Sequence, residues 1–159
     1  LPSVTEYVRS KGLKTFWAPY SDANGTRPSD QYLWDDYGFD EATYQINYFP
    51  GREDLPAARD ESYIKYIGEN ASAHGANIEM ELCGRTKENI SGLKAYLKGG
   101  IDYGYMNGDF ISWWISSDCK TVEYLRDSDD AYIRSTYDEI YKFIKKTLTE
   151  KEINTVMGD

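Results

Sequence analysis

Two glutamates, Glu79 and Glu81, stand two positions apart in the run NIEMEL. In an extended strand their α-carbons would lie roughly 6.6 Å apart, because a strand rises about 3.3 Å per residue. Glycoside hydrolysis requires two carboxyl groups, about 5–5.5 Å apart in retaining enzymes and about 6.5–9.5 Å apart in inverting enzymes. The spacing therefore permits acid–base or nucleophilic chemistry on a sugar.

Each glutamate also has a structural interpretation. Glu79 lies deeper in the predicted strand, where a buried acid would be paired with an arginine or a lysine, because buried charges need partners. Glu81 lies near the strand end and could be a solvated carboxylate there. Of the two, Glu81 is the better candidate for chemistry because it should be easier to reach.

Aromatic and amide side chains accompany the two acids. The chain contains 15 Tyr, 4 Trp and 5 Phe, 15% of its residues in all. Such rings offer a flat apolar face that suits stacking on sugars, although bulky β/α cores use them too. The predicted carbohydrate-binding residues are Trp17, Tyr20, Gln45, Asn47, Tyr48 and Trp114.

Other chemistry has little support in the sequence. His74 is the only histidine and precedes Gly75 at a predicted helix end, so its expected role is capping. With one histidine, a Ser-His-Asp triad and a zinc site are both disfavoured. No phosphate-binding loop or dinucleotide fingerprint occurs, so neither a cofactor nor a metal is expected.

Three further features are expected to be structural. The run Asp127–Asp130 (DSDD) lacks the spacing of a calcium loop and should cap the helix that follows it. The pair Gly99–Gly100 should end a helix. Cys83 and Cys119 are too few for a disulfide framework, and they are expected to be free thiols unless their strands are neighbours.

The charge balance narrows the choice of partners. The 18 basic and 27 acidic residues give a formal net charge of -9. Nucleic acid and anionic membrane surfaces are disfavoured, because both require a basic face. No apolar run approaches the roughly 18 residues of a membrane span. The chain begins at Leu1 without a signal peptide, so a processed, trimmed or fragmentary chain is expected.

Strand and helix patterns alternate along the 159 residues, which we take as a single domain. Short runs rich in β-branched and aromatic residues predict strands over 13–20, 42–49, 76–82 and 109–116. Apolar residues at helical spacing predict helices over 3–12, 30–37, 63–71, 90–101 and 133–148. Residues from Lys151 onward are expected to be frayed.

The predicted strands have one apolar and one polar face. In the third strand, Ile78 and Met80 alternate with Glu79 and Glu81. A doubly wound sheet is covered on both faces and should be apolar on both. The pattern therefore favours four β/α units that form half of a (β/α)8 barrel, which has eight units in about 250 residues. The alternative is a small open parallel α/β sheet.

Several segments in order resemble the bacterial family called domain of unknown function 4855. They are FWAPYSDANG, LWDDYGFDEATYQINYF, HGANIEMEL and RSTYDEIYKFIKK. The resemblance implies a glycosidase-type β/α barrel in secreted, periplasmic or cell-surface proteins of bacteria that feed on polysaccharide. Members are roughly twice this length, so the chain would be the second half of a barrel.

The resemblance further implies that Glu81 would end the seventh strand, which is the position of the nucleophile in retaining barrel glycosidases. The acid/base residue would end the fourth strand, outside this chain. The function expected is therefore glycoside hydrolase-like; the alternatives are a non-catalytic glycan-binding barrel and a fragment without activity alone. Open sheet edges invite pairing, so a missing N-terminal half or a second copy is the expected partner besides carbohydrate.

Overall fold

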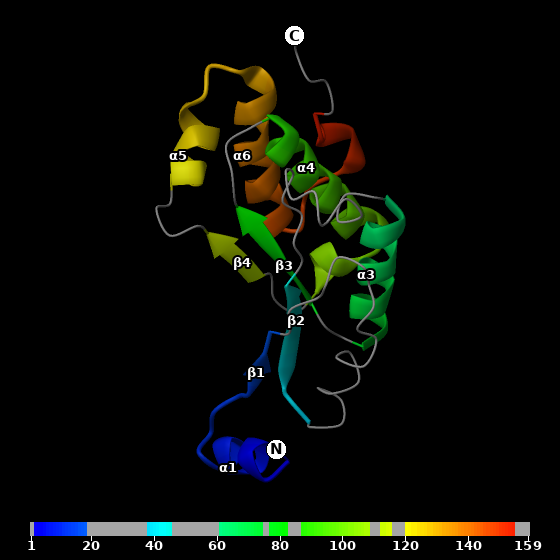
Figure 1. Cartoon of the computed structure of the whole chain (residues 1–159), viewed down its shortest axis with the longest axis vertical. Coiled ribbons are helices and arrows are strands. Elements are labelled where there is room, and N and C mark those ends of the chain that lie inside the picture. The colour runs from blue at the N-terminus through cyan, green and yellow to red at the C-terminus, as the bar shows by residue number, and fades with distance from the viewer. Residues whose placement is uncertain are drawn as a thin grey trace.

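The computed structural model describes residues 2–18, 38–45, 61–74, 77–82, 87–108, 112–115 and 120–154. Helices make up the larger part of these residues (Figure 1). The strands are β1 (Phe16–Trp17), β2 (Glu41–Gln45), β3 (Asn77–Leu82) and β4 (Ser112–Ile115). The helices are α1 (Pro2–Ser10), α3 (Glu61–His74), α4 (Lys87–Asp102), α5 (Lys120–Asp127) and α6 (Ala131–Ile144), with short 3-10 turns η2 (Tyr105–Asn107) and η3 (Glu150–Glu152).

The four strands lie in the order β1-β2-β3-β4 and pair in parallel. Parallel neighbours require crossover connections, and α3 and α4 lie in the crossovers from β2 to β3 and from β3 to β4. The parallel pairing agrees with the sequence prediction. The described strands form an open row, so the half-barrel itself stays a prediction, and the helix predicted over 30–37 lies outside the described residues.

The apolar core lies where β3 meets the helices α3, α4 and α6. Ile78 and Met80 of β3 are 3% and 0% exposed and join one apolar cluster with residues of these helices. Figure 1 shows α3, α4, α5 and α6 grouped at one end with β3 and β4, while α1 and β1 lie at the other end. No residue of α1 belongs to the described core cluster.

The pair Gly99–Gly100 does not end its helix, as the sequence suggested, because α4 continues to Asp102. A Cβ atom on Gly99 would stand 2.6 Å from the hydroxyl oxygen of Tyr105, and one on Gly100 would stand 2.6 Å from Cζ of Phe143. The two glycines therefore let both rings rest against the helix. The buried Tyr105 hydroxyl donates a hydrogen bond to the carbonyl of Tyr96.

Two predictions about the C-terminal part were wrong. Helix α6 ends at Ile144, because Lys146 adopts a left-handed backbone with φ of 57°. Leu148 keeps helical spacing and is buried, but it lies in the turn that follows. The start of the tail that was expected to be frayed is structured: Thr149 and Glu152 form a capping box on η3, and Ile153 is buried.

The aspartate-rich run caps a helix as predicted. Oδ1 of Asp130 accepts hydrogen bonds from the backbone amides of Tyr132 and Ile133 at 2.8 and 3.3 Å. Asp127 instead ends α5, a helix that the sequence did not predict, and its carboxylate pairs with Arg126.

Polar contacts hold α1 and β1 to the start of β2. Arg9 donates to Oδ1 of Asp40 at 2.8 Å and also to the carbonyl of Gly38. The backbone amide and the hydroxyl of Thr15 both donate to Oδ2 of Asp40 at 2.8 Å. The hydrogen bonds from Thr15, with the Arg9 guanidinium, lower the pKa of Asp40 from 3.8 to about 2.

The attachment of α1 and β1 should therefore depend on pH. Because the folded pKa of Asp40 is below its ordinary 3.8, its carboxylate stabilises the folded chain above that value, and this is lost as pH falls toward 2. Hydrogen exchange of the Glu41 amide, which donates to the Thr15 carbonyl, reports on the attachment. After correction for intrinsic rates, protection should be lower at about pH 2.5 than at about pH 5.

The variant Asp40→Asn should weaken this protection at both pH values, whereas Glu6→Gln, an exposed change on α1, should behave like wild type. Equal protection of the Glu41 amide at the two pH values in wild type would contradict the role given to Asp40.

Candidate functional site

The sheet register brings together several of the residues predicted from sequence. Gln45 of β2 pairs with Glu79 of β3, and Glu79 pairs with Ser112 of β4. Glu81, one residue before the end of β3, pairs with Trp114. Because positions alternate between faces along a strand, these residues occupy the sheet face opposite the buried Ile78 and Met80. The carboxyl end of β3 thus carries Glu81 beside Trp114 in the backbone register.

Glu79 is a buried acid, as one interpretation of the sequence expected. Only 9% of the residue is exposed, and it interacts with other groups in the structure. The arginine or lysine partner predicted for it stays a prediction. Burial makes Glu79 the weaker candidate for contact with a substrate, because a reacting group must be reachable.

Trp17 is only partly available to a ligand. It is half-buried, and its ring stacks on that of Phe39 with centroids 5.6 Å apart and planes 23° apart. Phe39 covers one face of the indole, so at most the other face can meet a sugar. The remaining predicted binding residues Tyr20, Asn47 and Tyr48 lie outside the described residues, as do Cys83 and Cys119.

The described part of the chain also bears on metal binding and on membrane insertion. It contains no group of three or more His, Cys, Asp or Glu side chains arranged to hold a metal ion. Among its helices, none combines the length and the apolar character that crossing a membrane requires. His74 is the last residue of α3, which agrees with its predicted place at a helix end.

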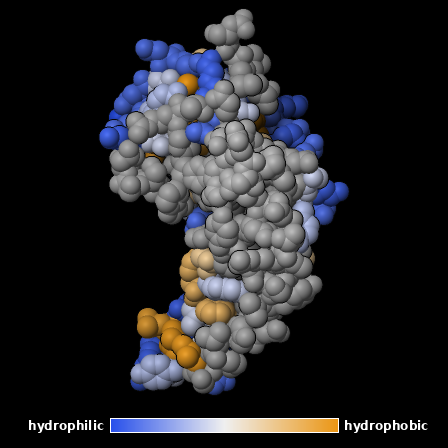
Figure 2. Space-filling view, in the orientation of Figure 1, coloured by the Kyte–Doolittle hydropathy of each residue, from blue (hydrophilic) through white to orange (hydrophobic). Residues whose placement is uncertain are grey.

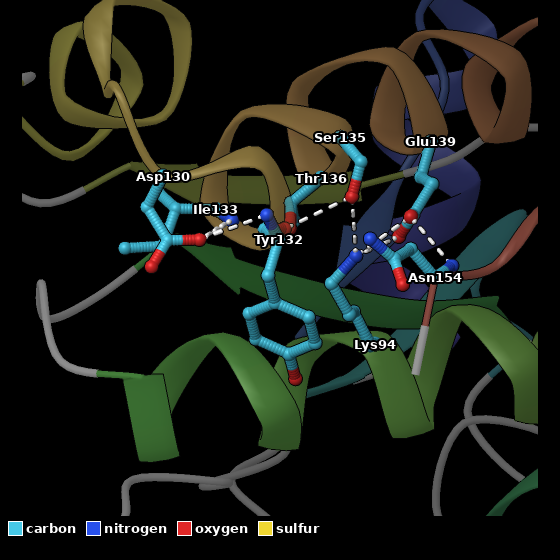
Figure 3. Close-up of polar contacts among 8 residues, drawn as sticks. All are labelled: Lys94, Asp130, Tyr132, Ile133, Ser135, Thr136, Glu139 and Asn154. Atoms are coloured by element: carbon cyan, nitrogen blue, oxygen red, sulfur yellow. Dashed lines mark hydrogen bonds and ion pairs between the residues drawn. The ribbon is translucent and has the colours of Figure 1, made fainter. Parts of the chain in front are cut away.

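A buried ion pair between α4 and α6 was not predicted from the sequence (Figure 3). The ammonium of Lys94 donates to both carboxylate oxygens of Glu139, at 2.6 and 2.7 Å, and each side chain is 3% exposed. Lys94 also donates to Oγ of Ser135 at 3.0 Å and lies 4.7 Å from the centre of the Tyr132 ring. The backbone amide of Asn154 donates to Oε1 of Glu139 at 2.9 Å.

This ion pair contains a lysine with a perturbed pKa, as many active sites do, but the lysine has no hydrogen-bond donor left for a substrate. Burial lowers the pKa of Lys94, and Glu139 partly opposes that shift. Perturbed lysines of this kind can act as bases or nucleophiles. However, the Lys94 ammonium donates one hydrogen bond to Ser135 and two to Glu139, which uses all three of its N–H donors. The geometry therefore fits a structural contact that joins α4, α6 and the C-terminal tail.

The described fold is that of an α/β protein whose parallel strands follow one another in chain order. The chain belongs to the family described as Domain of unknown function (DUF4855), and the model of that family matches residues 1–142. The family resemblance seen in the sequence is thereby confirmed. No curated protein and no solved structure matches the chain.

Proposed function

We propose that the chain is half of a glycoside hydrolase-like β/α barrel that acts on polysaccharide, with Glu81 as its reactive carboxylate. The observation that carries the proposal is the place of Glu81 at the carboxyl end of a parallel strand, in register with Trp114. In parallel β/α folds the substrate meets residues at these strand ends. Because polysaccharides lie outside the cell, the same proposal places the protein at the cell surface, in the periplasm or in the medium.

In this proposal Glu81 has one of two roles. As a nucleophile, its carboxylate attacks the anomeric carbon and forms a glycosyl ester while the leaving oxygen takes a proton from a second carboxylic acid. As a base, it removes a proton from the attacking water while the same acid protonates the leaving group. Both roles need that second acid. Glu79 is on the same sheet face but is buried, so the acid should come from the other half of the barrel.

A comparison of wild type with Glu81→Gln on a panel of soluble polysaccharides tests the proposal. Hydrolysis is measured by new reducing ends and binding by affinity electrophoresis in gels that contain each glycan. The amide keeps the size of the side chain but can neither attack nor accept a proton, so hydrolysis should fall by about 1,000-fold or more while binding persists.

The matched control is Glu69→Gln, because Glu69 is 60% exposed on α3 and has no place in the proposed site. Its hydrolysis and binding should equal those of wild type. If Glu81→Gln cleaves a glycan as fast as wild type does, Glu81 is not the reactive carboxylate.

A non-catalytic glycan-binding barrel is the second candidate, favoured by the burial of Glu79. With Glu79 9% exposed, β3 offers one carboxylate at its carboxyl end where hydrolysis needs two. The same panel separates the candidates: glycan retardation without any products, equal in wild type and Glu81→Gln, would indicate binding alone. Neither binding nor hydrolysis by any form would leave the chain as a fragment without activity of its own.

A further inference from the structure

An open hollow lies along one face of the short helix α5. Its volume is about 350 Å³, within the range of roughly 300–1,000 Å³ that small-molecule sites occupy. Two other hollows of the described chain, one between α3 and α4 and one beside the Lys94–Glu139 pair, hold about 210 Å³ each. The described residues that line the larger hollow are Lys120, Glu123, Tyr124, Asp127 and Ser128. We call it the α5 hollow.

Helix α5 lies at the edge of the sheet that carries the proposed site. It begins at Lys120, and residues 116–119 join it to the carboxyl end of β4 at Ile115. An extended chain spans at most about 3.6 Å per residue, so the α-carbons of Ile115 and Lys120 lie within roughly 18 Å of each other. Figure 1 shows α5 on the side toward which the arrows of β3 and β4 point. In parallel β/α folds the segments that follow the strands at this edge carry the binding residues.

The core makes little use of α5. The segments after β2 and β3 each contain one long helix, α3 and α4, whereas β4 is followed by α5 and then by the longer α6. Helix α5 buries only Thr121 and Leu125. Packing alone therefore does not account for this short helix at the binding edge of the sheet.

The lining of the α5 hollow combines an aromatic ring with groups that accept and donate hydrogen bonds. Tyr124 is half-buried and packs partly against the core, so part of its ring remains open to the hollow. Among the described residues, none forms a hydrogen bond with the Glu123 carboxylate or with the Tyr124 hydroxyl. Oγ of Ser128 accepts a hydrogen bond from the Asp130 amide at 3.2 Å, which leaves the hydroxyl proton available to a ligand.

The charges along α5 balance, which favours a neutral ligand. The guanidinium of Arg126 donates to both carboxylate oxygens of Asp127 at 2.6 Å, and Lys120 and Glu123 carry opposite charges. Figure 2 shows mainly hydrophilic residues over the part of the molecule where α5 lies. A sugar without charged groups fits such a lining, because its hydroxyls both donate and accept hydrogen bonds and its C–H face packs on an aromatic ring.

We infer that the α5 hollow is a subsite for a neutral polysaccharide, next to the carboxyl ends of β3 and β4. The inference rests on the proposed function, since it takes the glycan of that proposal as its ligand. Sugar units that extend from Glu81 past the end of β4 reach α5. There the Tyr124 ring holds the apolar face of one unit, and the Glu123 carboxylate accepts hydrogen bonds from its hydroxyls. The subsite strengthens binding of the chain and takes no part in bond cleavage.

Affinity electrophoresis in native gels that contain a neutral glucan, a neutral xylan or polygalacturonate tests the inference. Wild type should be retarded by at least one neutral glycan. Tyr124→Ala removes the ring and Glu123→Ala removes the carboxylate, and each should raise the apparent dissociation constant for that glycan about 10-fold. Because Tyr124 packs partly against the core, circular dichroism checks the folding of its variant. Glu123 is exposed, so Glu123→Ala should fold like wild type and gives a second, independent measurement.

Tyr141→Ala and Glu69→Ala are the matched controls, because they remove the same side chains from exposed positions of α6 and α3 outside the hollow. Both should bind like wild type. Equal retardation of wild type, Glu123→Ala and a folded Tyr124→Ala would overturn the inference, as would a wild type that is retarded by no neutral glycan.

The hydrolysis assay on the same samples keeps this inference separate from the proposed function. If hydrolysis depends on Glu81 but the α5 variants bind like wild type, only the subsite is lost. If the α5 variants bind more weakly but no form of the protein cleaves the glycan, only the hydrolase is lost, and the α5 hollow remains a glycan-binding site.

Discussion

Replacing Lys94 with methionine is expected to lower the free energy of unfolding by about 3–5 kcal/mol. Methionine fills a similar volume but leaves the carboxylate of Glu139, whose side chain is 3% exposed, buried without its cation. Of the contacts described for that carboxylate, only the amide of Asn154 would remain. Urea or guanidinium denaturation, followed by circular dichroism, measures the loss.

The matched control for this prediction is Lys98→Met on the same helix. The side chain of Lys98 is 41% exposed and pairs with Asp102 and Glu150, and exposed pairs contribute about 0–1 kcal/mol. Replacing both Lys94 and Glu139 with methionine should recover much of the stability, because no lone charge is then buried. If Lys94→Met costs no more than Lys98→Met, the buried pair does not hold α4 to α6.

Replacing Phe143 with alanine is expected to lower the free energy of unfolding by a similar amount, about 3–5 kcal/mol. The Phe143 ring is 1% exposed. It stands nearly perpendicular to the Trp113 ring, with centroids 6.1 Å apart, and its centroid lies 6.4 Å from that of the Tyr105 ring. Gly100 gives the ring its space against α4. Alanine would leave a cavity between β4, α4 and η2 that these rigid neighbours cannot fill.

Denaturation of three variants checks the Phe143 prediction. Phe143→Leu, which keeps part of the ring volume, should cost less than alanine, and Asp138→Ala on the exposed side of α6 should stay within about 0.5 kcal/mol of wild type. The near-ultraviolet signal of the tryptophans should change in both Phe143 variants, because each removes the ring that packs on Trp113, and it should not change in Asp138→Ala. If Phe143→Ala lowers the free energy of unfolding no more than Asp138→Ala does, Phe143 does not anchor α6 to the sheet.

Element types were predictable where a periodic pattern ran long enough, and boundaries were not. The cores of α3, α4, β3 and β4 lie within a few residues of their predicted positions. Leu148 shows why the end of α6 was misplaced: helical spacing reports burial, and a turn can bury a residue at the same spacing. Helix α5 was missed because its eight residues bury only Thr121 and Leu125, too few for a recognisable period.

The candidate site was predictable as a set of positions along strands, because alternation follows directly from the sequence. Gln45, Glu79, Glu81 and Trp114 do occupy neighbouring register positions. The contacts that decide their roles were not predictable. Nothing in the sequence indicates that Phe39 stacks on Trp17 or that Lys94 meets Glu139 across 45 residues. Such pairs depend on how the helices pack, and local patterns carry no signal for that.

The strand order has a consequence for synthesis on the ribosome. Because β1, β2, β3 and β4 adjoin in chain order, each new unit emerges beside the one already made, and no strand has to insert between two earlier ones. Yet α1 and β1 contribute nothing to the core cluster described, and that cluster is complete only after α6, Leu148 and Ile153 have been made. Val4 and Tyr7, which are 55% and 64% exposed in the folded chain, therefore stay exposed throughout translation, and a chaperone with affinity for apolar stretches would find a binding segment there.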